Sequence, residues 1–543
     1  MNELSFTSLG FWAAFATAFL ILAATQSLLP SRWNKALLRK LMLLGFSMAF
    51  YVWVARHLVA VLLLSVAINH VWALGIHRTT GRSRSFVTGS AVAFNVLTLG
   101  LFKYAYFVAD WIPGGSAALA WGGWRLEAWM LPLGISFFTF QTMSYLIDVH
   151  RKTIEAPASL LSFATYITFF PQLVAGPIVR ARVFLPQLES PQWVAAKGQD
   201  AVHVQRILSG FLKKLLLGDL VGVWLVDPVF DHPGDWASWE VLLALYGYSL
   251  QVYADFSGYT DMAKGMAGLM GIELPENFRF PYRASSPADF WRRWHMTLSM
   301  WWKDYVYIPL GGNRTLSVCS AGVTLVALVW VVWTWKELGG VLLVAGGTLL
   351  VVAAMLMSAG FYRKMATALN VMIVMLVGGL WHGAHLNFLM WGALNGAVLS
   401  LWILTPKGIS RAWKRALGWF VTFHTVVLAR IWFRAGSLVS WDETTSVPHP
   451  EDAWETATTL WQQLLLQPPS PWNLVWDSTY VMGILLLVLG YALHWMPESW
   501  RAWGQKKTTS FPMWATWCLW CAATGVAVWC SSSYHRPFIY WQF

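Results

Sequence analysis

The chain has 543 residues, a length that in a soluble protein would form roughly three or four domains. Apolar residues make up 57% of it and charged residues only 12%, and the charges cluster between long uncharged stretches. This composition excludes an intrinsically disordered chain, which needs low hydrophobicity and high charge. Four cysteines are too few for a secreted disulfide scaffold. The composition therefore predicts a protein that crosses a membrane many times.

Many stretches meet or approach the roughly 20 apolar residues that a helix needs to cross a bilayer. They are Leu9–Pro30, Leu41–Ala55, Leu58–Ile76, Phe86–Val108, Met130–Asp148, Leu160–Val179, Ile207–Leu225, Leu242–Ala254, Val318–Trp335, Val341–Phe361, Ala366–Leu380, Leu386–Leu404, Ala416–Trp432, Val481–Trp495 and Phe511–Trp529. Lipid cannot satisfy backbone polar groups, so we expect helices rather than strands. Several stretches are short or interrupted, and we expect about 11–14 of them to span the membrane. The predicted fold class is an all-α polytopic bundle.

The distribution of basic residues predicts how the chain is oriented. Leu9–Pro30 has no positively charged residue before it and is long, so we interpret it as a retained first span with the N-terminus outside. One orientation then places every basic loop inside. These loops hold Arg32–Lys40, Arg78–Arg84, Arg151–Lys152, Arg363–Lys364, Lys407–Arg415 and Arg501–Lys507. The acidic stretch Ala435–Tyr480 falls outside. Membrane topology thus accounts for the net charge of +12, and we expect no nucleic-acid binding.

One candidate span, Leu160–Val179, contains Pro171, Gly176 and Pro177. Prolines free backbone groups that lipid cannot satisfy, so such a segment is tolerated only inside protein or beside water. We therefore predict a re-entrant segment that enters and leaves on the cytoplasmic side.

The most polar region is Tyr253–Arg314, which is too charged to span lipid and too aromatic for a loose loop. Ser286 followed by Pro287 predicts the start of a helix that would carry Trp291, Trp294 and His295 on one face. The stretch Pro309–Asn313 has turn chemistry. We expect amphipathic helices at the inner surface that dip into the protein. A plain interfacial anchor is the alternative.

A second polar feature, Gly378–Asn387, interrupts two apolar stretches and contains His382. An ionisable residue at membrane depth is a functional hypothesis by default, and a neutral imidazole can accept a proton. The alternative is a structural histidine bonded to a carbonyl. His382 and His385 could share a metal, but no carboxylate accompanies them and we expect no metal site. No phosphate-binding loop with GK[ST] occurs, so we expect no use of ATP.

These features resemble the membrane-bound O-acyltransferase family, most closely its bacterial alginate O-acetyltransferase branch. The matching stretches are Leu131–His150, Phe169–Leu188, Tyr253–Arg314, Gly379–Gly396 and Ile431–Ala435. The most specific are DFWRRWHMTLSMWWKDYVYIPLGGNR and GLWHG. The resemblance implies a bundle with re-entrant and interfacial helices around a central cavity. It also implies two catalytic histidines, His382 at the bottom of that cavity and His295 facing it.

The resemblance further implies acyl transfer to a hydroxyl group. We expect acetyl to pass from a cytosolic thioester, acetyl-CoA, to an exopolysaccharide such as alginate, directly or through a periplasmic partner acetyltransferase. We assign substrate or donor binding to Trp381, Asn387, Arg292, Arg293, Lys303 and Asp304. No tightly bound cofactor is expected, and the location is the bacterial inner membrane, in contact with lipid. The alternatives are acylation of peptidoglycan, cellulose or teichoic acid, and a non-catalytic transporter or scaffold.

The domain organisation follows from the same resemblance. We predict N-terminal transmembrane helices in residues 1–90, the catalytic core in 91–435, an extracytoplasmic loop in 436–480 and C-terminal transmembrane helices in 481–543. The stretch Ser437–Trp476 is longer and more acidic than the resemblance leads us to expect. It is a candidate for binding a partner.

Overall fold

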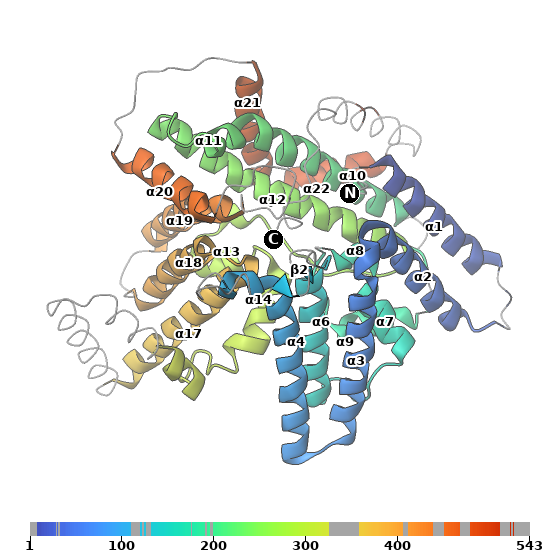
Figure 1. The fold of residues 1–543 in the computed structure, drawn as a ribbon. Coiled ribbons are helices and arrows are strands. Elements are labelled where there is room, and N and C mark those ends of the chain that lie inside the picture. Colours follow the sequence, from blue (N-terminus) through green and yellow to red (C-terminus); the bar gives the residue numbers. More distant parts are fainter. Residues whose placement is uncertain are drawn as a thin grey trace. The chain divides into compact units, whose positions relative to one another are not determined.

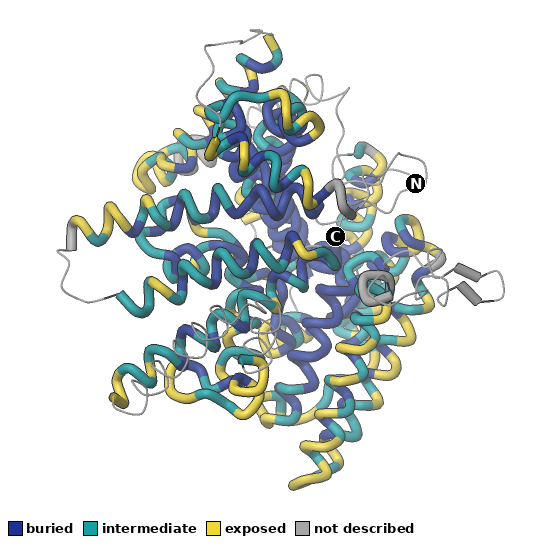
Figure 2. Tube along the Cα trace, turned by 60° about the vertical axis from the view of Figure 1, so that its left-hand side comes forward, coloured by how far each residue is buried: buried dark blue, intermediate teal, exposed yellow. Residues whose placement is uncertain are grey.

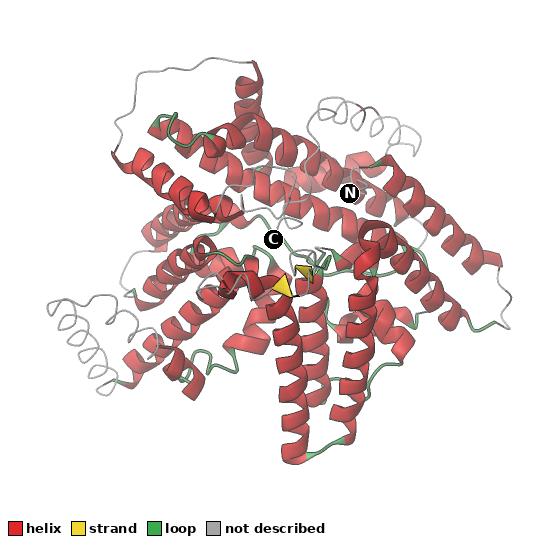
Figure 3. Cartoon of the chain, in the orientation of Figure 1, coloured by secondary structure: helices red, strands yellow, loops and turns green. Residues whose placement is uncertain are grey.

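The computed structural model describes residues 8–28, 30, 33–109, 120–121, 124–125, 132–174, 176–190, 193–195, 199–324, 358–405, 411–437, 450–466, 478–510, 522 and 525. Almost all regular structure in these ranges is helical (Figures 1 and 3). The strands described are β1 (Ala120–Trp121) and β2 (Trp124–Arg125), a short antiparallel pair. The predicted all-α polytopic fold is confirmed.

Within the described residues, eight helices are long and apolar enough to cross a membrane. They are α1 (Leu9–Leu28), α2 (Lys35–Ala55), α3 (Val59–Arg78), α4 (Gly81–Ala109), α17 (Ala359–His382), α18 (Leu386–Leu404), α19 (Arg411–Ser437) and α21 (Ser478–Trp495). Leu64 and Val71 on α3 and Leu97 on α4 expose 59%, 67% and 72% of their surface. Figure 2 shows many exposed positions, drawn in yellow, along the helices. Lipid tails accommodate exposed apolar side chains at no cost in solvation.

Three predicted spans lie largely outside the described residues, namely Val318–Trp335, Val341–Phe361 and Phe511–Trp529. The total of about 11–14 spans therefore stays a prediction.

The chain forms two compact units. The first contains Met1–Asp231, Tyr246–Asn277 and Pro471–Phe543, and the second contains His232–Leu245 and Phe278–Ser470. The predicted boundaries at residues 90, 435 and 480 follow membrane topology rather than compactness, and they stay predictions.

The first unit contains the interrupted segment that the prolines predict. After α6 (Ile135–His150), α7 (Leu160–Thr168) ends just before α8 (Phe170–Leu173), and α9 (Ala181–Leu188) follows. Phe169 in this break and Gln172 in α8 are fully buried. The Gln172 side chain donates a hydrogen bond of 2.6 Å to the carbonyl of Tyr166. The irregular backbone is thus enclosed by protein, as an interrupted segment requires. The side on which it enters and leaves the membrane stays a prediction.

The predicted span Ile207–Leu225 is built from three successive elements of the first unit. They are α10 (Asp200–Leu212) and two π-helices, η3 (Lys213–Leu220) and η4 (Gly222–Val226). They lead into α11 (Asp227–Asp231) and α12 (Ser238–Leu269), and α21 and α22 (Glu498–Ser510) come later in the chain. The buried ammonium of Lys214 lies 2.5 Å from Asp219 and 2.8 Å from Asp255. Its charge is therefore compensated inside the protein.

The second unit carries the segments with the predicted site residues. Besides the start of α12, it contains η5 (Pro281–Arg283), α13 (Pro287–Trp291), α14 (Met296–Trp302) and the π-helix η6 (Lys303–Tyr307), and it continues with α17, α18, α19 and α20 (Pro450–Leu466). α17 packs on α18, and α18 packs on α19 (Figure 1). A Cβ atom on Gly379 would lie 2.3 Å from the carbonyl oxygen of Phe388, and one on Gly392 would lie 2.4 Å from that of Met375. The backbones of α17 and α18 are therefore in direct contact.

Part of the predicted loop 436–480 is the helix α20. The side-chain amide of Asn387 on α18 donates a hydrogen bond of 2.9 Å to the carbonyl of Ala453. The rings of Trp432 and Trp454 lie 4.8 Å apart. α20 is therefore an integral element of the second unit.

Replacing Gly392 by Ala tests the contact between α17 and α18. The added methyl group would enter the space of the Met375 carbonyl, and overpacking of this kind costs about 1–3 kcal/mol. We expect a lower thermal unfolding midpoint in detergent. The matched control is Gly378→Ala on α17, where a Cβ atom meets nothing within 4 Å. Equal midpoints for the two variants would contradict this packing.

Candidate active site

His382 is the last residue of α17, and its imidazole is surrounded by aromatic rings. The residue is 7% exposed. Its ring centroid lies 4.7 Å from that of Trp381, 5.0 Å from that of Trp391 and 5.1 Å from that of Phe433. All three contacts are edge-to-face, the geometry that aromatic pairs prefer. Rings from α17, α18 and α19 therefore fix the orientation of this imidazole.

The chain around His295 differs in part from the sequence prediction. The predicted helix start is confirmed, because the hydroxyl of Ser286 accepts a hydrogen bond of 3.2 Å from the backbone N–H of Asp289. The predicted shared helical face of Trp291, Trp294 and His295 is wrong, because α13 ends at Trp291 and α14 begins at Met296. The carbonyl of Arg293 accepts a hydrogen bond of 2.9 Å from the backbone N–H of Arg279, instead of one from the next turn of a helix.

His295 lies between these two helices with a left-handed backbone, at φ 42° and ψ 54°. Backbone strain of this kind in a residue other than glycine is concentrated at functional sites. The residue is 2% exposed, and its ring stacks at 6.4 Å on that of Phe278. Burial lowers the pKa of His295 to about 3. The imidazole is therefore neutral throughout the physiological pH range.

Trp381 contacts both histidines. Its ring centroid lies 6.4 Å from that of His295 and 4.7 Å from that of His382. The structure thus brings three predicted site residues together in the second unit. Their chemical roles, and the cavity that should lead to them, stay predictions.

The other predicted site residues occupy two different places. Asn387 is fully buried, and its amide holds α20 through Ala453. Arg292 and Lys303 are exposed, and Asp304 is partly buried in η6. The guanidinium of Arg293 pairs at 3.0 Å with the carboxylate of Asp289. Their assignment to donor binding stays a prediction.

Three residues of the site were not predicted from the sequence. Trp391 and Phe433 touch the ring of His382, but an aromatic residue in an apolar helix gives no distinctive signal. Arg430 was identifiable, because it is a charge inside the predicted span Ala416–Trp432 and such charges mark functional sites. Its guanidinium carbon lies 4.9 Å from the ring centroid of Trp294 and 5.2 Å from that of Phe433.

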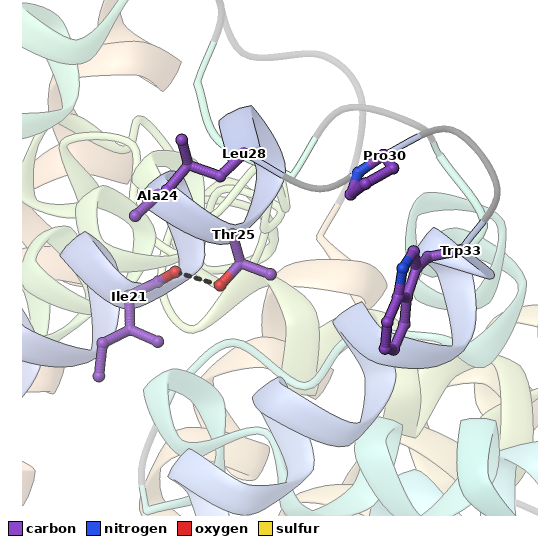
Figure 4. A pocket seen from close by; sticks show the side chains of 6 residues that line it. All are labelled: Ile21, Ala24, Thr25, Leu28, Pro30 and Trp33. Atoms are coloured by element: carbon purple, nitrogen blue, oxygen red, sulfur yellow. Dashed lines mark hydrogen bonds between the residues drawn. The ribbon is translucent and has the colours of Figure 1, made fainter.

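A pocket in the first unit has a different character. It is lined by Ile21, Ala24, Thr25, Leu28, Pro30 and Trp33 (Figure 4). Thr25 contributes a polar side chain to this lining. Its hydroxyl donates a hydrogen bond of 2.6 Å to the carbonyl of Ile21. This lining has no acid, base or nucleophile free to react and includes none of the predicted site residues.

Comparison with known proteins identifies the family. Residues 138–332, which include His295 and end before His382, match the model of the membrane-bound O-acyltransferase family. The chain is 33% identical over 412 residues to the probable alginate O-acetylase AlgI of Pseudomonas syringae pv. tomato, covering 74% of this chain and 68% of the relative. It is 32% identical over 433 residues to a peptidoglycan O-acetyltransferase of Helicobacter pylori, covering 74% and 72%.

A more distant relative is the teichoic acid D-alanyltransferase of Bacillus subtilis, 26% identical over 306 residues, or 54% of this chain and 66% of that protein. The chain belongs to the membrane-bound O-acyltransferase family, as the motifs around His295 and His382 predict. It is a multi-pass membrane O-acyltransferase.

The burial of His295 predicts a specific pH dependence of stability. An unfolded imidazole binds a proton below its ordinary pKa of 6.5, whereas the buried ring stays neutral down to about 3. The unfolded state therefore gains protons as the pH falls, and the protein loses stability. This residue should contribute roughly 1–2 kcal/mol of that loss by pH 5. Unfolding midpoints at pH 7.5 and pH 5 should differ less in His295→Gln than in the wild type. The same difference in both proteins would contradict the buried, neutral state.

Proposed function

We propose that the enzyme transfers acetyl from a cytosolic thioester, acetyl-CoA, to a hydroxyl group of an extracytoplasmic polysaccharide such as alginate. The observation that supports this most directly is the contact of Trp381 with both His295 and His382 in a buried aromatic site. Relatives named alginate O-acetylase, which match three quarters of the chain, support acetyl as the group and alginate as the acceptor.

In this proposal His382 is the general base. A hydroxyl group is a poor nucleophile at neutral pH, and an imidazole that removes its proton during attack makes it competent. The hydroxyl oxygen attacks the thioester carbonyl carbon, and its proton passes to His382. The carbon–sulfur bond then breaks, and the leaving thiolate takes the proton from His382. His382 ends α17, and the partial negative charge at a helix C-terminus stabilises the transient imidazolium.

His295 has a different part in this scheme. A ring whose pKa is about 3 does not hold a proton at neutral pH, so it acts as a neutral hydrogen-bonding group. It can orient the reacting acyl or hydroxyl group, while His382 alone accepts the proton.

The donor would approach the basic residues Arg283, Arg292, Arg293 and Lys303. CoA is polyanionic, so positive charge on this segment would speed its binding, and the effect would weaken with salt.

The acceptor is either the sugar hydroxyl itself or a serine of a periplasmic partner acetyltransferase. The similarity to a peptidoglycan O-acetyltransferase supports peptidoglycan as the second candidate polymer.

We further propose that the protein lies in the bacterial inner membrane with its N-terminus outside, because this orientation places all basic loops inside. A phosphatase that is active only outside the cytoplasm tests it. Fusion within residues 406–410, at the start of the basic loop Lys407–Arg415, should give an inactive reporter, and fusion within the acidic stretch 438–449 should give an active one. The reverse pattern would invert the proposed topology.

Replacing His382 by Ala tests the general base. Purified protein receives labelled acetyl-CoA with an acceptor polysaccharide, with and without a soluble partner acetyltransferase. Without a base, transfer should fall by about 10²–10⁴-fold while the protein still folds. The matched control is His424→Ala on α19, whose ring nitrogen lies 2.8 Å from the carbonyl of Phe420 in its own helix.

The control variant should keep normal transfer. Wild-type rates in a folded His382→Ala protein would contradict the assignment of the base. Transfer by the wild type from another acyl thioester but not from acetyl-CoA would contradict the proposed donor.

A further inference from the structure

Arg430 is a buried cation in the same unit as the two histidines, and the scheme above gives it no part. The residue is 2% exposed. Its guanidinium carbon lies 4.9 Å from the ring of Trp294, the neighbour of His295 in the chain, and 5.2 Å from the ring of Phe433. The imidazole of His382 packs on that same phenyl ring, at 5.1 Å. Arg430 therefore lies beside the aromatic surroundings of both histidines.

The charge of Arg430 has little compensation among the described residues. Its Nε atom is buried there without a hydrogen-bond partner, and no carboxylate of the described residues lies within ion-pair distance of it. An arginine cannot lose its proton in a protein, so it cannot escape the cost of burial by becoming neutral. Contacts with aromatic faces recover only about 0.5–2 kcal/mol. A buried guanidinium with so little compensation is suited to binding a negatively charged group.

We propose that Arg430 binds the negatively charged oxygen that forms on the acyl carbonyl during transfer. This inference rests on the proposed acyl transfer. When the acceptor oxygen bonds to the carbonyl carbon, the electron pair of the C=O bond moves to its oxygen. When the carbon–sulfur bond breaks, that pair returns to form the carbonyl of the ester, and the sulfur leaves with the bonding electrons. Arg430 gives up no proton, and its N–H groups donate to the oxygen while it is charged.

Arg430 is better suited to binding a negatively charged oxygen than to acting as a proton donor or a base. His382 becomes positive when it takes the proton, so a second fixed cation nearby is tolerable only if negative charge appears at the same time. The charged carbonyl oxygen supplies it in that step. A fixed donor in a water-poor site contributes more than the same donor in water, and removing one costs about 10²–10³-fold in kcat.

The test separates kcat from KM in purified enzyme with labelled acetyl-CoA and acceptor. Arg430→Ala and Arg430→Gln should lower kcat by about 10²–10³-fold and change KM for the donor by less than about threefold. Guanidinium ion added at millimolar concentration should restore activity to Arg430→Ala by at least about tenfold, and it should not restore His382→Ala. Arg415→Ala, at an exposed arginine near the start of α19, is the matched control and should behave as the wild type.

Three other outcomes would overturn the inference. A raised KM with normal kcat would mean that Arg430 binds a permanent anion of the donor or acceptor. Folded Arg430→Gln with normal kcat would mean that the charge has no part in the reaction, and this variant decides the matter if Arg430→Ala does not fold. Loss of activity that guanidinium does not rescue would indicate a structural role. A wild-type enzyme without acyl transfer would instead overturn the proposed function itself.

Discussion

The backbone leaves α17 directly after His382 and turns into α18 within three residues, and the rest of the site depends on this reversal. Gly383 is extended, and a Cβ atom there would lie 2.0 Å from the ring of Phe388. Any side chain at this position would displace that ring, which packs at 5.4 Å on Phe433. Phe433 in turn supports the imidazole of His382 and the guanidinium of Arg430. The glycine at position 383 thus allows three helices to surround one histidine.

The two histidines differ in what their positions allow them to do. His295 is fixed between α13 and α14 in a strained backbone conformation, and burial keeps it neutral. His382 stands at a helix C-terminus, where a transient positive charge is favourable. Trp381 touches both rings. One site therefore offers a neutral hydrogen-bonding group, a base and, in our inference, a fixed cation, which together match the charges that appear and disappear in acyl transfer.

The sequence predicted those features that depend on local chemistry. Apolar composition gave the helical membrane fold, Ser286 with Pro287 gave the start of α13, and Pro171 marked the break between α7 and α8. It did not predict that α13 would end after Trp291, because the competing hydrogen bond comes from Arg279, which is distant in sequence. The aromatic partners of His382 come from three helices, so only their packing reveals them. Arg430 did carry a signal, as a charge within an apolar stretch.

The proposed function requires that acyl transfer takes place at His382. The most direct measurement is a cryo-electron microscopy structure of the full chain with an acetyl-CoA analogue whose sulfur linkage cannot be cleaved. We expect the acyl carbon in the second unit, within about 4 Å of the imidazole of His382 and with its oxygen directed to Arg430. An analogue bound in a defined position with its acyl group far from this imidazole would contradict the account.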